Sequence, residues 1–239
     1  SLDEEADFNA FVSGGLSHIR RIGDWQRTTW ETTVKGYGSK QFEEDQVDTI
    51  YVEATSGVRF AMGGEKNDAF SFKPYVKGAY LFLGSDSYNT GMSAGLLTNT
   101  KLGDSAVLGL GYEYTLQNYL SNDDRPNADD REGDEHQFTA SLGYKLSKET
   151  TLTFKGDYFM IDADTDWWTS DAYQAGVRLT HVVGGAPLPG ILPMSFSAGA
   201  SWYMADYDAP NPNLPAPANT TTRDGDERWV FDVSAMVPF

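Results

Sequence analysis

WVFDVSAMVPF, residues 229–239, is the stretch of sequence that decides the fold of this chain. Every second side chain in it is apolar, from Trp229 through Val233 to the terminal Phe239. Successive side chains of a β-strand point to opposite faces, so one face of this strand is apolar along its whole length. Such a face has to lie against an apolar environment, which is either a protein core or a lipid bilayer.

The same stretch resembles the assembly signal of bacterial outer-membrane β-barrels, in which a terminal Phe closes the last strand. The residues that carry this resemblance are Trp229, Phe231, Val233, Val237 and Phe239. The resemblance implies that the chain meets the barrel assembly machinery, the lipids of the outer membrane and lipopolysaccharide.

Length and composition narrow the class of protein. A chain of 239 residues is long enough for one large all-β domain. It has 35 acidic and 18 basic residues, a net charge of −17, which excludes nucleic acid as a partner because nucleic-acid binding needs a basic surface. Cysteine is absent, so disulfides and thiolate metal sites are excluded. No apolar run reaches the ~18 residues of a transmembrane helix, and residues 1–7 lack the pattern of a signal peptide. We therefore expect any export signal to have been removed or to lie outside this sequence.

Alternating segments separated by turn residues cover most of the chain, which predicts β-strands. The clearest is 194–204, where the even-numbered residues are apolar and the odd-numbered ones are small or hydroxylic. Similar alternation runs over 106–115, 137–146, 152–160 and 173–180, and weaker alternation over 8–20, 25–41, 46–62, 70–83 and 89–100. With the terminal stretch, the sequence predicts eleven strands.

Three features favour lipid over a protein core for the apolar faces. The strands span about 9–14 residues, longer than the ~5–6 usual in globular sheets. The opposite faces carry charges among Gly and Ser, which suits a polar lumen. Aromatic residues near strand ends are typical of interfacial girdles; they are Tyr112, Tyr114, Tyr144, Tyr158, Trp202 and Trp229. We predict a transmembrane antiparallel up-and-down β-barrel of the bacterial outer membrane; a soluble sandwich or lipocalin-like barrel is the alternative.

The connections alternate between short and long, as they do in outer-membrane barrels. If the terminal Phe is periplasmic, the long polar loops at 118–134, 162–171 and 206–226 are extracellular, and the tight turns at 22–24, 63–68, 102–104 and 147–150 are periplasmic. One long apolar turn, 184–193, also falls on the periplasmic side, where it is either a rigid Pro-rich link or a contact with a partner domain.

An odd number of strands conflicts with the rule for single-chain bacterial barrels, which have an even number and two periplasmic termini. Either two strands are merged in this count, or a first strand lies upstream. Open edges in lipid cost several kcal/mol for each unpaired backbone group, so we expect a closed barrel of about twelve strands. Residues 1–239 are then one barrel domain, the C-terminal part of a longer protein.

Several short segments resemble the barrel domain that follows tetratricopeptide repeats in some Gram-negative outer-membrane proteins, among them the surface lipoprotein assembly modifiers. The segments are Trp30-Glu31-Thr32 with Tyr37, Gly57-Val58-Arg59-Phe60, Gly133-Asp134-Glu135-His136, Trp202-Tyr203, Tyr207-Asp208-Ala209-Pro210, and 223–229 leading to Val237-Pro238-Phe239. The resemblance covers most of the chain. It implies an upstream periplasmic repeat domain or a partner chain, and a role in secretion.

The polar faces of the expected strands carry charges of both signs, with basic residues in the majority. They are Glu31, Lys35, Glu53, Arg59, Lys73, Lys77, Glu113, Lys145, Lys155, Asp157 and Arg178. Such charges either pair across a lumen or line a narrow aqueous path with a weak preference for anions. The alternative is a packed polar plug that does not conduct.

The acidic loops contain the weak metal-site candidates Asp162, Asp164 and Asp166. They resemble oxygen-rich calcium-binding sequences but do not fit the EF-hand pattern, so a solvated loop, or one that holds lipopolysaccharide-bridging cations, is the simpler interpretation. The adjacent Trp167-Trp168 is interpreted as an interfacial anchor, with a ligand-stacking patch as the alternative.

The sequence contains no phosphate-binding loop, no dinucleotide-binding fingerprint and no metal-binding His pair. His18, His136 and His181 have no Ser or Asp partner at a diagnostic spacing. His136 is interpreted as a surface histidine, and a base–carboxylate pair with Asp134 and Glu135 is the alternative. We expect no enzymatic activity and no cofactor. The predicted function is a porin-like polar passage for solutes or for an exported polymer or protein. The alternative is a plugged structural barrel whose acidic extracellular loops bind partners or cations.

Overall fold

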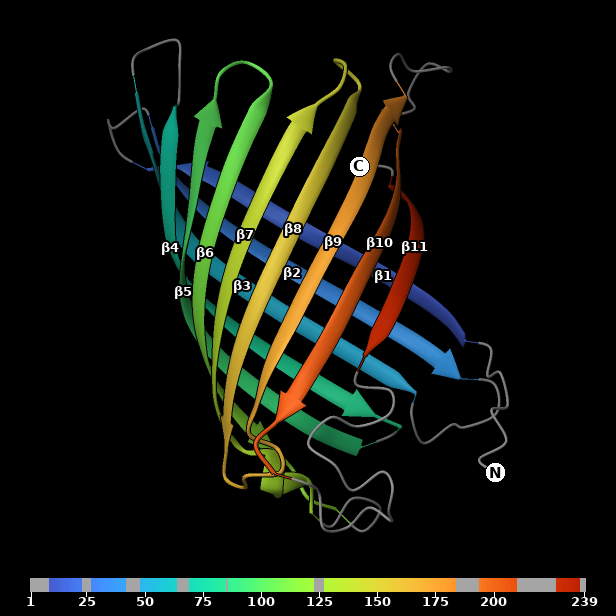
Figure 1. The fold of residues 1–239 in the computed structure, drawn as a ribbon. Helices are drawn as coiled ribbons and strands as arrows, with labels where there is room; N and C mark the ends of the chain where they lie inside the picture. The colour runs from blue at the N-terminus through green and yellow to red at the C-terminus, as the bar shows by residue number, and fades with distance from the viewer. Residues whose placement is uncertain are drawn as a thin grey trace.

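The computed structural model describes residues 9–22, 27–41, 48–63, 69–84, 86–122, 127–183, 194–209 and 227–236. These residues form one antiparallel sheet in which each strand pairs with the next along the chain (Figure 1). The strands are β1 (Asn9–Arg21), β2 (Thr28–Gln41), β3 (Thr49–Met62), β4 (Phe70–Leu83), β5 (Asp86–Leu102), β6 (Ala106–Tyr119), β7 (Gly133–Lys145), β8 (Thr150–Ala163), β9 (Ser170–Val183), β10 (Met194–Tyr207) and β11 (Arg228–Met236).

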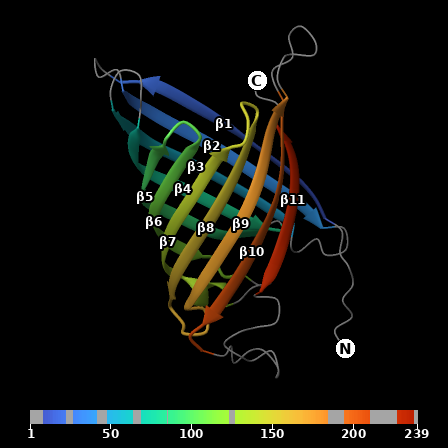
Figure 2. The same ribbon diagram turned by 45° about the horizontal axis from the view of Figure 1, so that its top comes forward.

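The eleven strands expected from the period-2 pattern are therefore confirmed, and nine of the ten strands up to β10 are 13 or 14 residues long. The sheet curls so that β1–β3 run behind β7–β10 (Figures 1 and 2). Within the described residues β1 and β11 form no ladder with each other. The twelve-stranded closure stays a prediction.

The two faces of the sheet differ in the way that separates a membrane barrel from a soluble sandwich. Large apolar side chains on one face are exposed, such as Met92 at 74% and Phe231 at 76%. Among the described residues, the buried apolar side chains are only Tyr88, Ala128, Ala172 and Ala205. A soluble sandwich would bury the apolar faces of its strands in a core. The apolar face is therefore the outside of the barrel, and lipid is the environment that suits it.

A row of aromatic rings crosses four neighbouring strands on this outer face. Tyr112 of β6 lies 5.1 Å from Phe138 of β7, which lies 6.2 Å from Tyr158 of β8, and Tyr158 lies 5.1 Å from Tyr173 of β9, measured between ring centroids. The Tyr158 hydroxyl donates to Asp171 at 2.8 Å. Rings with an apolar body and a polar tip suit the boundary between hydrocarbon and water.

The ladder registers assign the connections to the two ends of the sheet. Gln117 pairs with Gly133, Gly133 with Ala163, and Ser170 with Tyr207, so the three long loops predicted to be extracellular share one end. The tight turns that join β5 to β6 and β7 to β8 lie at the opposite end. These connections agree with the sequence, but the β4–β5 connection is a tight turn, between Leu83 and Asp86, at the long-loop end. Most of the predicted turns 22–24 and 63–68 and the whole apolar turn 184–193 lie outside the described residues, as do Val237 and Phe239 of the assembly signal.

A short 3-10 helix, η2 (Ala128–Arg131), follows β6 at the long-loop end. Among the described residues, no helix has the length and hydropathy needed to cross a bilayer.

Candidate functional site

All eleven charged residues predicted for the lumen share one face of the sheet, the face opposite to the exposed apolar residues. Lys35 pairs with Glu53, and Glu113 lies opposite Gly95, which in turn lies opposite Tyr75. The same parity continues through the remaining ladders to Arg178. This polar face follows from the period of two: one set of alternate residues meets lipid, and the other set meets the interior of the curled sheet.

The first cluster on the polar face is centred on Glu31 of β2. Arg59 of β3 holds its carboxylate with two bonds, Nε to Oε1 at 2.6 Å and Nη2 to Oε2 at 3.1 Å, and Lys73 of β4 donates to Oε2 at 3.2 Å. Two cations share one carboxylate, so this group of three residues carries a net positive charge.

The second cluster is centred on Glu113 of β6, which is only 7% exposed. Tyr75 of β4 donates its hydroxyl proton to Glu113 Oε2 at 2.6 Å, and Lys77 of β4 forms an ion pair with Oε1. Both β4 side chains reach Glu113 across β5, Tyr75 at the level of Gly95 and Lys77 from the position opposite Ser93. A Cβ on Gly95 would come within 2.5 Å of the Tyr75 ring, so glycine at this position is what allows the contact.

The third cluster lies on β7 to β11, around a hollow of about 420 Å³. Asp157 of β8 accepts bonds from Gln137 Nε2 at 3.0 Å and from Thr139 Oγ1 at 2.6 Å, and pairs with Lys155 at 2.9 Å. Arg178 of β9 reaches Asp232 of β11 at 2.9 Å. This hollow therefore has a wall that carries both signs of charge.

Two of the ion pairs that face the interior expose the cation far more than the carboxylate, whereas Lys73 and Glu31 are equally exposed, at 13% and 15%. The Lys35 side chain is 63% exposed and its partner Glu53 is 15% exposed. The Lys155 side chain is 53% exposed, whereas Asp157 is 2% exposed. The carboxylates lie against the wall, where hydroxyl and amide groups also donate to them, as Tyr51 does to Glu53 at 3.0 Å. At Lys35 and Lys155, water in the interior consequently meets the ammonium group more than the carboxylate.

Lys145 lies on the polar face close to a tight turn and belongs to none of the three clusters described. Asp162, Asp164 and Asp166 are not brought together as a metal site. Among the described residues, no three His, Asp or Glu side chains lie close enough to hold a metal ion.

A surface histidine, the favoured interpretation of His136, agrees with the structure, and the alternative pairing with Glu135 does not form because neighbouring residues of a strand face opposite sides. Glu135 accepts a bond from Gln117 on the polar face at 2.6 Å. His136 lies on the outer face, where its Nδ1 is hydrogen-bonded to the Tyr112 hydroxyl at 2.9 Å. His181 Nδ1 is hydrogen-bonded to the Thr150 hydroxyl, also at 2.9 Å.

The alternating pattern of the sequence did not predict the residues that pair with these charged side chains. Tyr75, Gln137 and Thr139 complete the clusters, and Asp232 supplies the counter-charge for Arg178. Asp232 carried a usable signal, since it is the acidic residue on the polar side of the terminal strand. The others needed the register of the strands, which alternation alone does not give.

No protein-family model and no curated protein matches this sequence. Solved outer-membrane proteins are similar to it in structure. The NanC porin matches with a TM-score of 0.54 at 9% identity, over 96% of this chain and 99% of that one. The KdgM porin in complex with disordered oligogalacturonate matches with a TM-score of 0.46 at 12% identity, over 83% and 90% of the two chains. OmpT, an outer membrane protein of Vibrio cholerae, matches with a TM-score of 0.40 at 11% identity, over 98% of each chain.

At 9% identity the likeness to NanC is a likeness of fold. It covers almost the whole of both chains and confirms the outer-membrane β-barrel fold that the sequence predicted.

Proposed function

We propose that the chain forms a passage for small polar solutes across the bacterial outer membrane, and that this passage prefers anions. The observation that carries the proposal is the unequal exposure within two interior ion pairs, where Lys35 and Lys155 face water and their carboxylates lie against the wall. Rings and rows of basic side chains favour anions in pores, because they replace part of the hydration that the ion loses.

The acidic balance of the whole chain does not oppose this preference. The net charge of −17 is that of the whole chain, and salt at physiological concentration screens charges in solution over about 8 Å. A solute inside the barrel responds mainly to the groups that line its path, and apolar walls strengthen their field.

The size of the barrel favours small solutes. Barrels of about 8 strands are filled by side chains and those of 16–18 strands leave an aqueous channel, so a sheet of eleven strands lies between these cases. A folded protein would not pass. An exported polymer, which the resemblance to the surface lipoprotein assembly modifiers implies, would have to pass in an extended form.

The experiment that tests the proposal is conductance of the intact protein in planar lipid bilayers under a KCl gradient. We expect stable current steps and a reversal potential on the anion-selective side. Lys155→Glu should move the reversal potential towards cation selectivity. Lys148→Glu, the same change of charge at an exposed residue in the tight turn before β8, should leave it unchanged.

Two results would overturn the proposal. Folded protein that shows a heat-dependent gel shift but no current would favour the plugged barrel that binds partners through its loops. A cation-selective current in the wild type would contradict the proposal that the exposed lysines line the passage and make it prefer anions.

We also propose that the barrel has no catalytic activity. His136, which follows Asp134 and Glu135 in the sequence, is directed away from the polar face and is bonded to Tyr112. A hydrolytic activity of the purified protein that is lost in His136→Ala would contradict this.

A further inference from the structure

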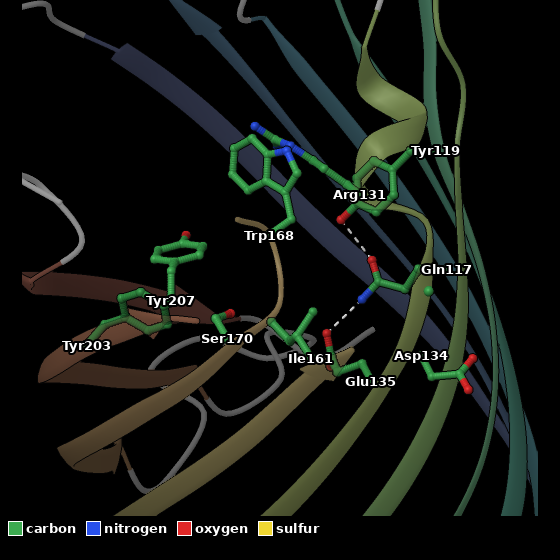
Figure 3. A pocket seen from close by; sticks show the side chains of 11 residues that line it. Gln117, Tyr119, Arg131, Asp134, Glu135, Ile161, Trp168, Ser170, Tyr203 and Tyr207 are labelled. Atoms are coloured by element: carbon green, nitrogen blue, oxygen red, sulfur yellow. Dashed lines mark hydrogen bonds between the residues drawn. The ribbon is translucent and has the colours of Figure 1, made fainter. Parts of the chain in front are cut away.

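A second concave site lies at the long-loop end of the polar face, apart from the three charged clusters. It is a cleft of about 160 Å³ at the ends of β6 to β10, where Glu135, Ile161, Ser170 and Tyr207 follow one another across the ladders. Figure 3 shows Tyr203 and Tyr207 on one side of it and Tyr119 and Gln117 on the other. The proposed passage does not account for a cleft with this lining.

The aromatic wall of the cleft is fixed in place by Arg131, the last residue of η2. The guanidinium carbon lies 3.7 Å from the centroid of the Trp168 ring, and Nη1 donates to the Tyr88 hydroxyl at 2.6 Å. Tyr88 is 7% exposed and packs edge-on against Tyr119, while Tyr207 packs edge-on against Trp168. A cation stacked on an indole and anchored to a buried phenol holds the ring in one orientation, as a preorganised site requires.

The polar wall is a chain of hydrogen bonds that ends in a carboxylate. Tyr119 donates its hydroxyl proton to Gln117 Oε1 at 2.8 Å, and Gln117 Nε2 donates to Glu135 Oε2 at 2.6 Å. The described residues donate to only this oxygen of Glu135, so Oε1 is left as an acceptor. Ser170, which is buried, adds a hydroxyl to the same cleft.

This lining matches the chemistry of a sugar ring. A pyranose has an apolar C–H face that packs on an aromatic ring, and a rim of hydroxyl groups that both donate and accept hydrogen bonds. A cavity of about 150 Å³ holds a molecule of benzene, so this cleft admits one six-membered ring. A flat aromatic ligand would leave the carboxylate and amide unpaired.

We propose that this cleft binds one sugar ring of a soluble saccharide, with the ring packed against the aromatic wall formed by Trp168, Tyr203 and Tyr207 and its hydroxyl groups bonded to Glu135 and Gln117. The site lies on the polar face and not on the lipid-facing side, which favours a saccharide in solution over a membrane glycolipid. The inference does not rest on conduction, because a barrel with a closed interior would hold the same cleft.

The test is binding of two neutral probes, maltotriose and N-acetylated chitotriose, to the intact protein in detergent, followed by calorimetry and tryptophan fluorescence. We expect saturable binding of at least one probe with a Kd on the order of 1 mM or tighter. Trp168→Ala should weaken it by about tenfold or more, because it removes part of the aromatic wall and the ring on which Arg131 is stacked. Tyr173→Ala removes an aromatic ring from the outer face and should leave the Kd unchanged.

Glu135→Gln provides a second variant of nearly equal size, for the case in which Trp168→Ala does not fold. It should weaken binding several-fold while the heat-dependent gel shift and circular dichroism stay as in the wild type. The proposal is overturned if neither probe binds the wild type saturably, or if folded Glu135→Gln binds as tightly as the wild type. No current is involved, so these outcomes are independent of the bilayer experiment.

Discussion

Arg178 and Asp232 form an ion pair at 2.9 Å although their strands, β9 and β11, are not neighbours in the sheet. The strand between them, β10, presents Gly199 at this level, opposite Arg178 on one side and Asp232 on the other. A Cβ on Gly199 would lie 2.8 Å from Asp232 Oδ1 and 3.6 Å from Arg178 Nε. A missing side chain on the middle strand is what lets the outer two strands pair.

Gly199→Ala should therefore push the carboxylate away from the guanidinium. We expect the barrel to lose about 0.5–1 kcal/mol of unfolding free energy, the value of a well-formed but partly exposed ion pair. The measurement is urea unfolding of the refolded protein in detergent micelles. Gly78→Ala is the matched control, because a Cβ at Gly78 meets no atom within 4 Å, and it should cost nothing or stabilise slightly. Equal effects of the two changes would contradict the account.

The same relationship recurs at Gly95, where the contact is tighter. A Cβ there would come within 2.5 Å of the Tyr75 ring and 2.7 Å of the Tyr112 carbonyl oxygen. Gly95→Ala should displace Tyr75 from Glu113 and cost about 1–3 kcal/mol of stability, as overpacking does. In a Tyr75→Ala background the change should cost less, with a coupling of at least about 0.5 kcal/mol in the double-mutant cycle. Strict additivity of the two substitutions would refute the proposed role of this glycine.

Asp157→Asn tests the two roles of a carboxylate in the wall, which are to stabilise the barrel and to neutralise a neighbouring lysine. The side chain is 2% exposed and accepts bonds from Gln137 and Thr139 as well as pairing with Lys155. The NH2 group of an asparagine would face the donor groups of Gln137, Thr139 or Lys155 and could not accept their bonds. We therefore expect the free energy of unfolding in urea to fall by about 1–3 kcal/mol. Lys155 also loses its counter-charge, so the reversal potential in a KCl gradient should move further towards anion selectivity.

Asp232→Asn is the comparison for that change. Asp232 is 34% exposed and holds only Arg178 among the contacts described. Its loss should cost less than about 1 kcal/mol, because solvent screens an exposed pair. If the two asparagine variants were equally stable, burial of Asp157 would not be what makes it a structural anchor.

Much of the fold could be predicted because the side chains of a strand alternate between two faces, and the face that meets lipid must be apolar along the whole strand. Alternation along 194–204 predicted β10, and the same parity assigned Lys155 and Arg178 to the polar face. The contacts between them depend on register and on glycines in intervening strands, which a one-strand pattern does not contain. The pairing of Tyr75 with Glu113 is an example, since 38 residues and one whole strand separate them.

The aromatic cleft was out of reach for a different reason. Trp168 was interpreted mainly as a membrane anchor, because a Trp pair at a loop tip is typical of an interface. Its contact with Arg131 joins the loop before β7 to the loop after β8, which the β7–β8 ladder brings together. Neither loop alone contains a pattern that predicts the contact. The loose tetratricopeptide-associated family resemblance and the upstream domain it implies stay predictions.

Val233→Arg tests which face of the terminal strand meets lipid. Val233 is exposed and pairs with Ala198 on the apolar side of the β10–β11 ladder, whereas the next residue, Ser234, pairs with Ser197 on the polar side. An arginine near the bilayer midplane costs about 2–4 kcal/mol in a β-barrel, so Val233→Arg should lower the stability of the protein in lipid vesicles by an amount of that order. Ser234→Arg adds the same side chain to the neighbouring position and should cost much less, because an arginine there has water and carboxylates within reach. Unfolding by guanidinium in vesicles gives both values, and a larger loss for Ser234→Arg would reverse the assignment of inside and outside on which the passage depends.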